Sequence, residues 1–134
     1  MRAAAAKIVI KSPREIELLR AAGRVVHRVL TELGDLVRPG VTTAALDARA
    51  DELIRAAGAV ALFKGVRNPQ ARMPFPACIC ASLNEQVVHG IPDDRPLREG
   101  DILNIDCGVR LKGYCGDAAA TFPVGRVAPA VQRL

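Results

Sequence analysis

The stretch DILNIDCGVRLKGYCGDAAATF, residues 101–122, decides the fold because it has the pattern of two strands joined by a tight turn. Apolar and polar residues alternate with period two across 101–109, and a second run with strand character spans 114–122. Residues 110–113 separate the two runs, and Gly113 can adopt the positive φ that tight turns require. The stretch therefore predicts a β-hairpin.

Two aspartates of this hairpin raise the first question about function. If the hairpin closes symmetrically over residues 110–113, Asp106 lies directly opposite Asp117. Like charges opposite one another across a ladder are destabilising, so the pair requires a cation, a shared proton or a different register. The spacing alone leaves two interpretations open: a divalent cation held by carboxylate oxygens, or an exposed sheet face with two solvated aspartates.

The alternation also separates a polar face of the first strand from an apolar one. Asp106 is expected to share its face with Ile102, Asn104 and Gly108. The opposite face is predicted to point into the core and comprises Leu103, Ile105, Cys107 and Val109. Asp117 has small neighbours in Gly116 and Ala118, which leave room above the sheet.

Upstream of the hairpin the pattern changes to helices. A short apolar strand is predicted at residues 8–10. A helix is then expected to start with Ser12 as N-cap, Pro13 at the first helical position and Glu15 completing a capping box. One apolar stripe at helical spacing is expected to pack on the sheet, formed by Ile16, Leu19, Val26, Leu30 and Leu33.

A second helix is expected after Thr42 and Thr43, which offer N-cap hydroxyls, with Gly58 as its C-cap. Residues 65–76 are predicted to form a loop, since they contain three prolines and a glycine. The order of two helices followed by mostly antiparallel strands predicts an α+β fold, with two helices packed on an antiparallel sheet.

The composition limits the classes of function. The 134 residues are 50% hydrophobic and 25% charged, which indicates one globular domain over residues 1–134. The net charge of +5 is dispersed and is not interleaved with aromatic residues, so no specific nucleic-acid site is expected. The N-terminal segment is too short for a signal peptide and no apolar run reaches the length of a membrane span, so a cytoplasmic protein without membrane contact is expected.

Histidine and cysteine residues give weaker signals. His89, within NEQVVHGIP, is predicted at a strand end, where sites collect, although a lone histidine is more often structural. His27 lies off the apolar stripe and is given no function. Free thiols are expected for all four cysteines, Cys78, Cys80, Cys107 and Cys115. Cys115 is either a metal contact or a small packed side chain.

Four segments carry a family resemblance: IKSPREIELLRAAGRVV, VRPGVTTAALD, FPACICASLNEQVVHGIPDDRPLREGDILNIDCGV and GYCGDAAATFPVG. Together they resemble type I methionine aminopeptidase, of the pita-bread metallopeptidase superfamily, from about residue 10 to the end of the chain. The block at 84–122 is the most specific. The resemblance implies the first half of the pita-bread catalytic domain, a fold made of two pseudo-symmetric halves.

The resemblance implies a peptidase that removes the initiator methionine from nascent proteins when the second residue is small. Two divalent metal ions bridged by water or hydroxide would be its cofactors, and cobalt, manganese, iron and zinc are all compatible with such ligands. Asp106 matches a ligand of one ion, and Asp117 matches the ligand that bridges both. His89 matches the catalytic histidine that contacts substrate. Phe75 and Cys80 match residues that line the pocket for the methionine side chain.

The implied partner is the N-terminal methionine of a nascent polypeptide, with the ribosome as a further partner. A monomer is expected for the full-length protein. Cys115 and Ala118 stand where family members commonly carry histidine and serine or threonine, neither of which is a metal ligand there.

The larger departure is length. The second half of the family fold supplies a histidine ligand, two glutamate ligands and a further catalytic histidine, and none of these motifs occurs in residues 1–134. Two oxygen-bearing side chains alone bind a divalent ion weakly, so this chain is expected to have little or no peptidase activity by itself. A non-catalytic pita-bread binding module, a truncated inactive gene product and a superfamily member that cleaves dipeptides or X-Pro bonds remain alternatives.

Overall fold

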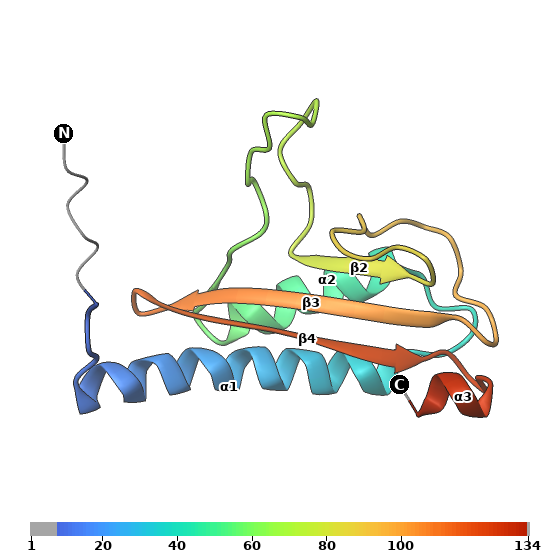
Figure 1. The fold of residues 1–134 in the computed structure, drawn as a ribbon. Helices are drawn as coiled ribbons and strands as arrows, with labels where there is room; N and C mark the ends of the chain where they lie inside the picture. The colour runs from blue at the N-terminus through green and yellow to red at the C-terminus, as the bar shows by residue number, and fades with distance from the viewer. Residues whose placement is uncertain (1–7, 134) are drawn as a thin grey trace.

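The computed structural model describes residues 8–133. Two helices precede four strands, and a short helix follows them (Figure 1). In chain order the elements are α1 (Pro13–Leu36), α2 (Thr43–Ala56), β1 (Val60–Ala61), β2 (Ile79–Leu83), β3 (Ile102–Leu111), β4 (Tyr114–Pro123) and α3 (Pro129–Gln132). No helix in this part of the chain has the length and apolar character needed to cross a membrane.

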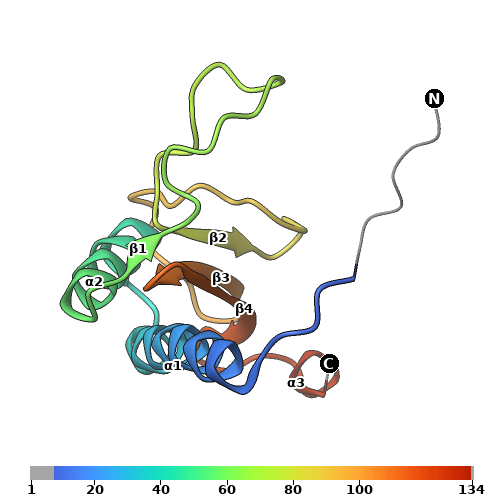
Figure 2. The same ribbon diagram turned by 90° about the vertical axis from the view of Figure 1, so that its left-hand side faces the viewer.

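Strand β3 is the centre of the sheet. Strands β1 and β2 pair with one of its edges, β4 pairs with the other, and all the pairings are antiparallel. Helix α1 packs against β3 and β4, and α2 packs against β1 and β2, so both helices cover one face of the sheet (Figure 2). The predicted α+β fold, with two helices on an antiparallel sheet, is confirmed.

The helix starts follow the sequence signals. The Ser12 side chain accepts from the Glu15 N–H while the Glu15 carboxylate accepts from the Ser12 N–H, which forms the predicted capping box. Thr42 caps α2 by accepting from the Ala45 N–H at 3.1 Å, and Gly58 follows the C-cap of this helix with a φ of 68°. These contacts confirm both predicted helices.

The strand predicted at residues 8–10 is wrong. This segment has no regular secondary structure, and its side chains are exposed, with Ile8 at 90%. An apolar, β-branched run forms a strand only where it pairs with another strand, and residues 8–10 pair with none of the strands within residues 8–133. The apolar stripe of α1 is likewise only partly buried: Val26, Leu30 and Leu33 lie in the core, whereas Ile16 is 44% exposed.

The register of the hairpin also differs from the prediction. The turn contains only Lys112 and Gly113, which have φ values of 50° and 84°, as a type I′ turn requires. Residues 110 and 111 belong to β3 instead of the turn. Asp106 therefore lies opposite Ala119, and Asp117 lies opposite Gly108. The shift is by two positions, so it keeps both aspartates on the same face of the sheet.

The two faces of β3 differ as the alternation predicts. The core side chains Leu103, Ile105, Cys107 and Val109 are all 0% exposed. They join apolar side chains of α1, α2 and β2 in one cluster. The helices therefore seal this face, and the face that carries Asp106 remains open.

Candidate functional site

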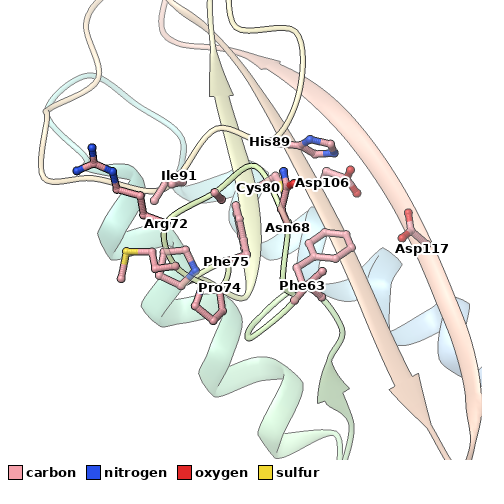
Figure 3. A pocket seen from close by; sticks show the side chains of 14 residues that line it. Phe63, Asn68, Arg72, Pro74, Phe75, Cys80, His89, Ile91, Asp106 and Asp117 are labelled. Carbon is pink, nitrogen blue, oxygen red and sulfur yellow. The ribbon is translucent and has the colours of Figure 1, made fainter.

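A cleft of about 740 Å³ lies on the open face of the sheet. One wall is the face of β3 and β4, and the other is the loop at 62–76, which rises out of the fold (Figures 1 and 3). The cleft is lined by every residue that the sequence singled out for the site: Phe75, Cys80, His89, Asp106 and Asp117. The fold therefore brings these five side chains together from β2, β3, β4 and two loops.

The two aspartates approach the cleft from neighbouring strands. A Cβ atom at Gly108 would lie 3.0 Å from Asp117 Oδ2 and 2.8 Å from Phe63 Cε1. Any larger residue at position 108 would therefore push into the space that the Asp117 carboxylate occupies. Asp106 Oδ1 is buried and has no hydrogen-bond partner within residues 8–133. An orphaned carboxylate oxygen is unfavourable unless some other group satisfies it.

The electrostatics of the two aspartates also indicate that another group is needed to stabilise them. Burial raises the pKa of Asp106, the negative charge of Asp117 raises it further, and His89 opposes both effects. Two ionised carboxylates in one cleft are therefore unfavourable on their own, and a divalent cation reverses the sign of their interaction. Hard oxygen donors and an unsatisfied buried oxygen fit such a cation.

The described part of the chain supplies an incomplete set of ligands. Within residues 8–133, no group of three or more histidine, cysteine, aspartate or glutamate side chains is arranged to hold a metal ion. The site thus offers a pair of carboxylates, Asp106 and Asp117, and leaves the rest of a coordination shell open.

His89 does not lie at the end of β2, as the sequence suggested, but in the loop that follows it. Its φ of 59° places it in the left-handed region, which residues other than glycine rarely adopt. The next residue, Gly90, holds the loop against β2: its N–H donates to Ser82 Oγ at 3.0 Å and its carbonyl accepts from the Ala81 N–H at 2.9 Å. This anchor directs the His89 ring toward the same end of the cleft as Asp106 (Figure 3).

Gly90 is the residue that makes this anchor feasible. A Cβ atom at position 90 would lie 2.1 Å from the Ala81 carbonyl oxygen, which belongs to the backbone of β2. Only glycine lets the two backbones approach so closely. The dipeptide HG in the sequence therefore combines a cleft side chain with the residue that positions it.

Apolar side chains line the cleft beside these polar groups. Cys80 lies opposite Asp106 in the ladder and is 5% exposed. Burial raises the pKa of its thiol to about 11, with contributions from the charges of Asp106 and Asp117, so the thiol stays neutral. Phe75 is half-buried, and its backbone is hydrogen-bonded to Gly65 and Val66 across the base of the loop. A neutral thiol and an aromatic ring suit an apolar ligand group.

Several cleft residues could not be found from the sequence. Phe63, Val66, Met73 and Ile91 extend the apolar lining, and Asn68 and Arg72 add polar groups. They lie in irregular segments, where no periodicity reports which side chains point inward. Cys115, weighed in the sequence as a metal contact, is exposed and does not line the cleft, and the four cysteines are free thiols as predicted.

Fold and site together define a helix-backed antiparallel sheet whose open face carries a carboxylate pair suited to divalent cations. The chain belongs to metallopeptidase family M24, whose family model matches residues 17–134. This membership implies a metallopeptidase that uses divalent metal ions.

The relatives agree with this assignment. The chain is 46% identical to a methionine aminopeptidase of Clostridium acetobutylicum over 128 residues. The matched region covers 95% of this chain and 49% of that protein. The chain is similar to the crystal structure of methionine aminopeptidase from Rickettsia prowazekii, with a TM-score of 0.84, 38% identity, and coverage of 96% of this chain and 49% of the other.

A more distant match shows the fold alone. The Xaa-Pro dipeptidase from Bacillus anthracis has a TM-score of 0.73 at 22% identity, over 92% of this chain and 32% of that one. The predicted pita-bread fold is confirmed by these structures. The chain spans about half the length of the curated relatives it matches.

Proposed function

We propose that residues 1–134 form the first half of a methionine aminopeptidase catalytic domain, and that the complete protein removes the initiator methionine from nascent polypeptides. The observation that carries this proposal is the convergence of Asp106 and Asp117 on one cleft, with Asp106 Oδ1 buried and unsatisfied among the described residues. The similarity to curated methionine aminopeptidases supports the substrate.

Asp106 and Asp117 would both serve as ligands of the divalent metal ions. Cobalt, manganese, iron and zinc all accept such ligands. When bound, divalent cations lower the pKa of a coordinated water and polarise a peptide carbonyl. The separation of the two carboxylates across neighbouring strands, with room kept by Gly108, is the contribution of this chain to that site.

The remaining cleft residues would bind the substrate. His89, which precedes the Gly90 anchor, would hydrogen-bond a peptide group of the substrate beside the carboxylates. Phe75 and Cys80 would line the pocket for the methionine side chain, because a neutral thiol and an aromatic ring make favourable contacts with a thioether. The cleft thus places apolar side chains beside the carboxylate pair.

The isolated 134-residue chain is expected to have little or no peptidase activity. A pair of carboxylates would leave most of a divalent ion's coordination shell to water, so its affinity for the ion would be weak. The complete protein is proposed to act as a cytoplasmic monomer on chains that emerge from the ribosome.

Calorimetric titration with Mn²⁺ tests the proposed cation site. We expect the wild-type chain to bind Mn²⁺ weakly. We expect Asp106→Asn and Asp117→Asn to bind it with at least about tenfold lower affinity, because each variant removes one of the carboxylates. Asp94→Asn is the matched control, since Asp94 is exposed and does not line the cleft. Binding that is equal in all four proteins would contradict the site and favour a non-catalytic binding module.

Hydrolysis of a Met-Ala-Ser peptide with excess manganese or cobalt tests the inactivity of the isolated chain. We expect turnover at or near the background rate. Turnover that matches an intact homologue would refute the inactivity without refuting the cation site.

A further inference from the structure

The segment between β2 and β3, residues 84–101, is tethered to the rest of the fold by two buried hydroxyl groups. In the described part of the chain, the buried polar side chains are those of Ser82 and Thr43, which are 3% and 2% exposed. Ser82 Oγ accepts from the Gly90 N–H at 3.0 Å. Thr43 Oγ1 accepts from the Asp93 N–H at 2.9 Å and donates to the Asp93 carbonyl at 3.2 Å. Each hydroxyl therefore holds a different point of the same segment.

The Ser82 tether acts directly beside His89, a side chain of the cleft. The Gly90 N–H that Ser82 binds belongs to the peptide group that joins Gly90 to His89. The Gly90 carbonyl, which accepts from the Ala81 N–H, belongs to the following peptide group. Of the two hydrogen bonds between Gly90 and β2, the one to Ser82 is thus the one that fixes the peptide plane adjoining His89.

His89 needs such a restraint because its backbone conformation is unfavourable. Its φ of 59° lies in the left-handed region, where the Cβ atom of an L residue approaches its own backbone too closely. A residue stays in this region only when the surrounding structure holds it there. His89 lies outside the helices and strands, so the hydrogen bond of the adjoining peptide group is the nearest restraint on it.

The conformation of His89 also decides where its ring lies. Figure 3 shows the ring directed toward the same part of the cleft as Asp106. With Gly90 packed on β2, a change in φ or ψ of His89 would swing the ring away from Asp106. Ser82 and Gly90 are both buried, so loss of the hydroxyl would leave a buried N–H without its acceptor, which is unfavourable.

We propose that Ser82 is a positioning residue for His89. Its hydroxyl holds the peptide group between His89 and Gly90 and thereby keeps the imidazole beside the carboxylates. The inference rests on the proposed role of His89 in binding the substrate, but the contact through Gly90 can be measured without metal or substrate. Thr43 provides the matched comparison, because it is equally buried and tethers the same segment at Asp93 instead of at Gly90.

NMR measurements on the metal-free chain, with EDTA present, test the contact through Gly90. In Ser82→Ala we expect the Gly90 amide to exchange with solvent at least about tenfold faster relative to the core amides of β3, because it loses its buried acceptor. The three-bond coupling between the amide and α protons of His89 reports its φ, and we expect this coupling to change. Ser82→Thr keeps the hydroxyl and should restore both values. Thr43→Ala should change neither, although it removes an equally buried hydroxyl.

A Mn²⁺ titration of the same four proteins tests the position of the ring. In the wild-type chain we expect the paramagnetic ion to broaden the imidazole signals of His89 together with the amide signals of residues 106–108. In Ser82→Ala the broadening at 106–108 should persist while that of the imidazole is lost, because paramagnetic broadening falls steeply with distance. Thr43→Ala should behave as the wild-type chain does. A general loss of stability would not produce this difference between the two variants.

Unchanged Gly90 exchange and His89 coupling in Ser82→Ala would overturn the proposal, and so would equal changes in Ser82→Ala and Thr43→Ala. Imidazole broadening that persists in Ser82→Ala would overturn it as well. Absence of broadening at residues 106–108 in every protein would contradict the proposed cation site instead, and the metal-free measurements would then decide the role of Ser82.

Discussion

The two faces of the sheet are built from the same strands and differ in almost every physical property. On the face that α1 and α2 cover, the β3 side chains are apolar and 0% exposed. On the open face, β3 and β4 carry carboxylates, and one buried oxygen lacks a partner among the described residues. Because side chains alternate along β3, one face of this strand contributes to the core and the other contributes to the cleft.

The largest expected difference between the faces is in stability. Ile105→Ala on the covered face should lower the free energy of unfolding by about 2–5 kcal/mol, because it leaves a cavity in a sealed core. Ile102→Ala on the open face, where the side chain is only partly buried, should lower it by about 1 kcal/mol or less. Urea denaturation measures both values. Equal losses would mean that the two faces are equally packed.

Glycines give a second contrast. Gly90→Ala should destabilise the chain by about 1–3 kcal/mol, since the added Cβ meets the backbone of β2 at 2.1 Å. Gly23→Ala in α1 meets nothing within 4 Å and should stabilise the chain by up to about 1 kcal/mol. Thermal denaturation of the two variants measures the contrast. A neutral Gly90→Ala variant would show that the loop holding His89 is free to move away from β2.

The contribution of Asp101, directly before β3, to the stability of the fold should depend on pH. A hydrogen bond from Asn84 Nδ2 is the main cause that lowers the pKa of Asp101; burial opposes it, and the Arg98 N–H assists it. A lowered pKa contributes stability that is present above the ordinary value of 3.8 and is lost as the pH falls through the folded-state pKa.

Asp101→Asn should therefore lower stability by about 0.5–1 kcal/mol at neutral pH and by less in acid. Denaturation curves at neutral and acidic pH measure this difference, with Asp94→Asn as the exposed control. A difference that grows as the pH falls would have the wrong sign for this hydrogen bond.

The smallest expected effect concerns thiol reactivity and leaves stability unchanged. Cys107 on the covered face has its pKa raised to about 12, mainly by burial, and Cys80 in the cleft has its pKa raised to about 11. Both should react slowly with a disulfide reagent, because the thiolate is the reactive form. Cys115 is exposed, so one fast phase is expected, and Cys115→Ser should remove it. A fast phase that survives this substitution would show that the cleft opens.

The face of the sheet on which each β3 side chain lies was easier to predict from the sequence than the pairing of residues across the hairpin. The alternation correctly put Asp106 on the face of the sheet opposite to Ile105 and Cys107. The shift of the hairpin pairing by two positions did not change which side chains share a face. The turn length was not predictable, since Arg110 and Leu111 are compatible with either a strand or a turn. Only the paired φ values of Lys112 and Gly113 decide between them.

The cleft residues that lie in local sequence motifs could be named from the sequence, and those outside such motifs could not. Asp106, Asp117, His89, Phe75 and Cys80 could be named because they lie in recognisable segments, and all five line the cleft. Phe63 and Met73 could not, because their positions depend on how the loop at 62–76 folds over the sheet. Residues 8–10 show the opposite error, in which local propensity predicted a strand that has no partner.

The most direct test of the central claim uses the paramagnetism of Mn²⁺ in an NMR titration of the wild-type chain. If Asp106 and Asp117 hold a cation together, substoichiometric Mn²⁺ should selectively broaden the amide signals of residues 106–108 and 117–119. Signals of α2, which lies on the far side of the sheet, should stay sharp. Broadening centred on other acidic residues, or none at these two strands, would contradict the account.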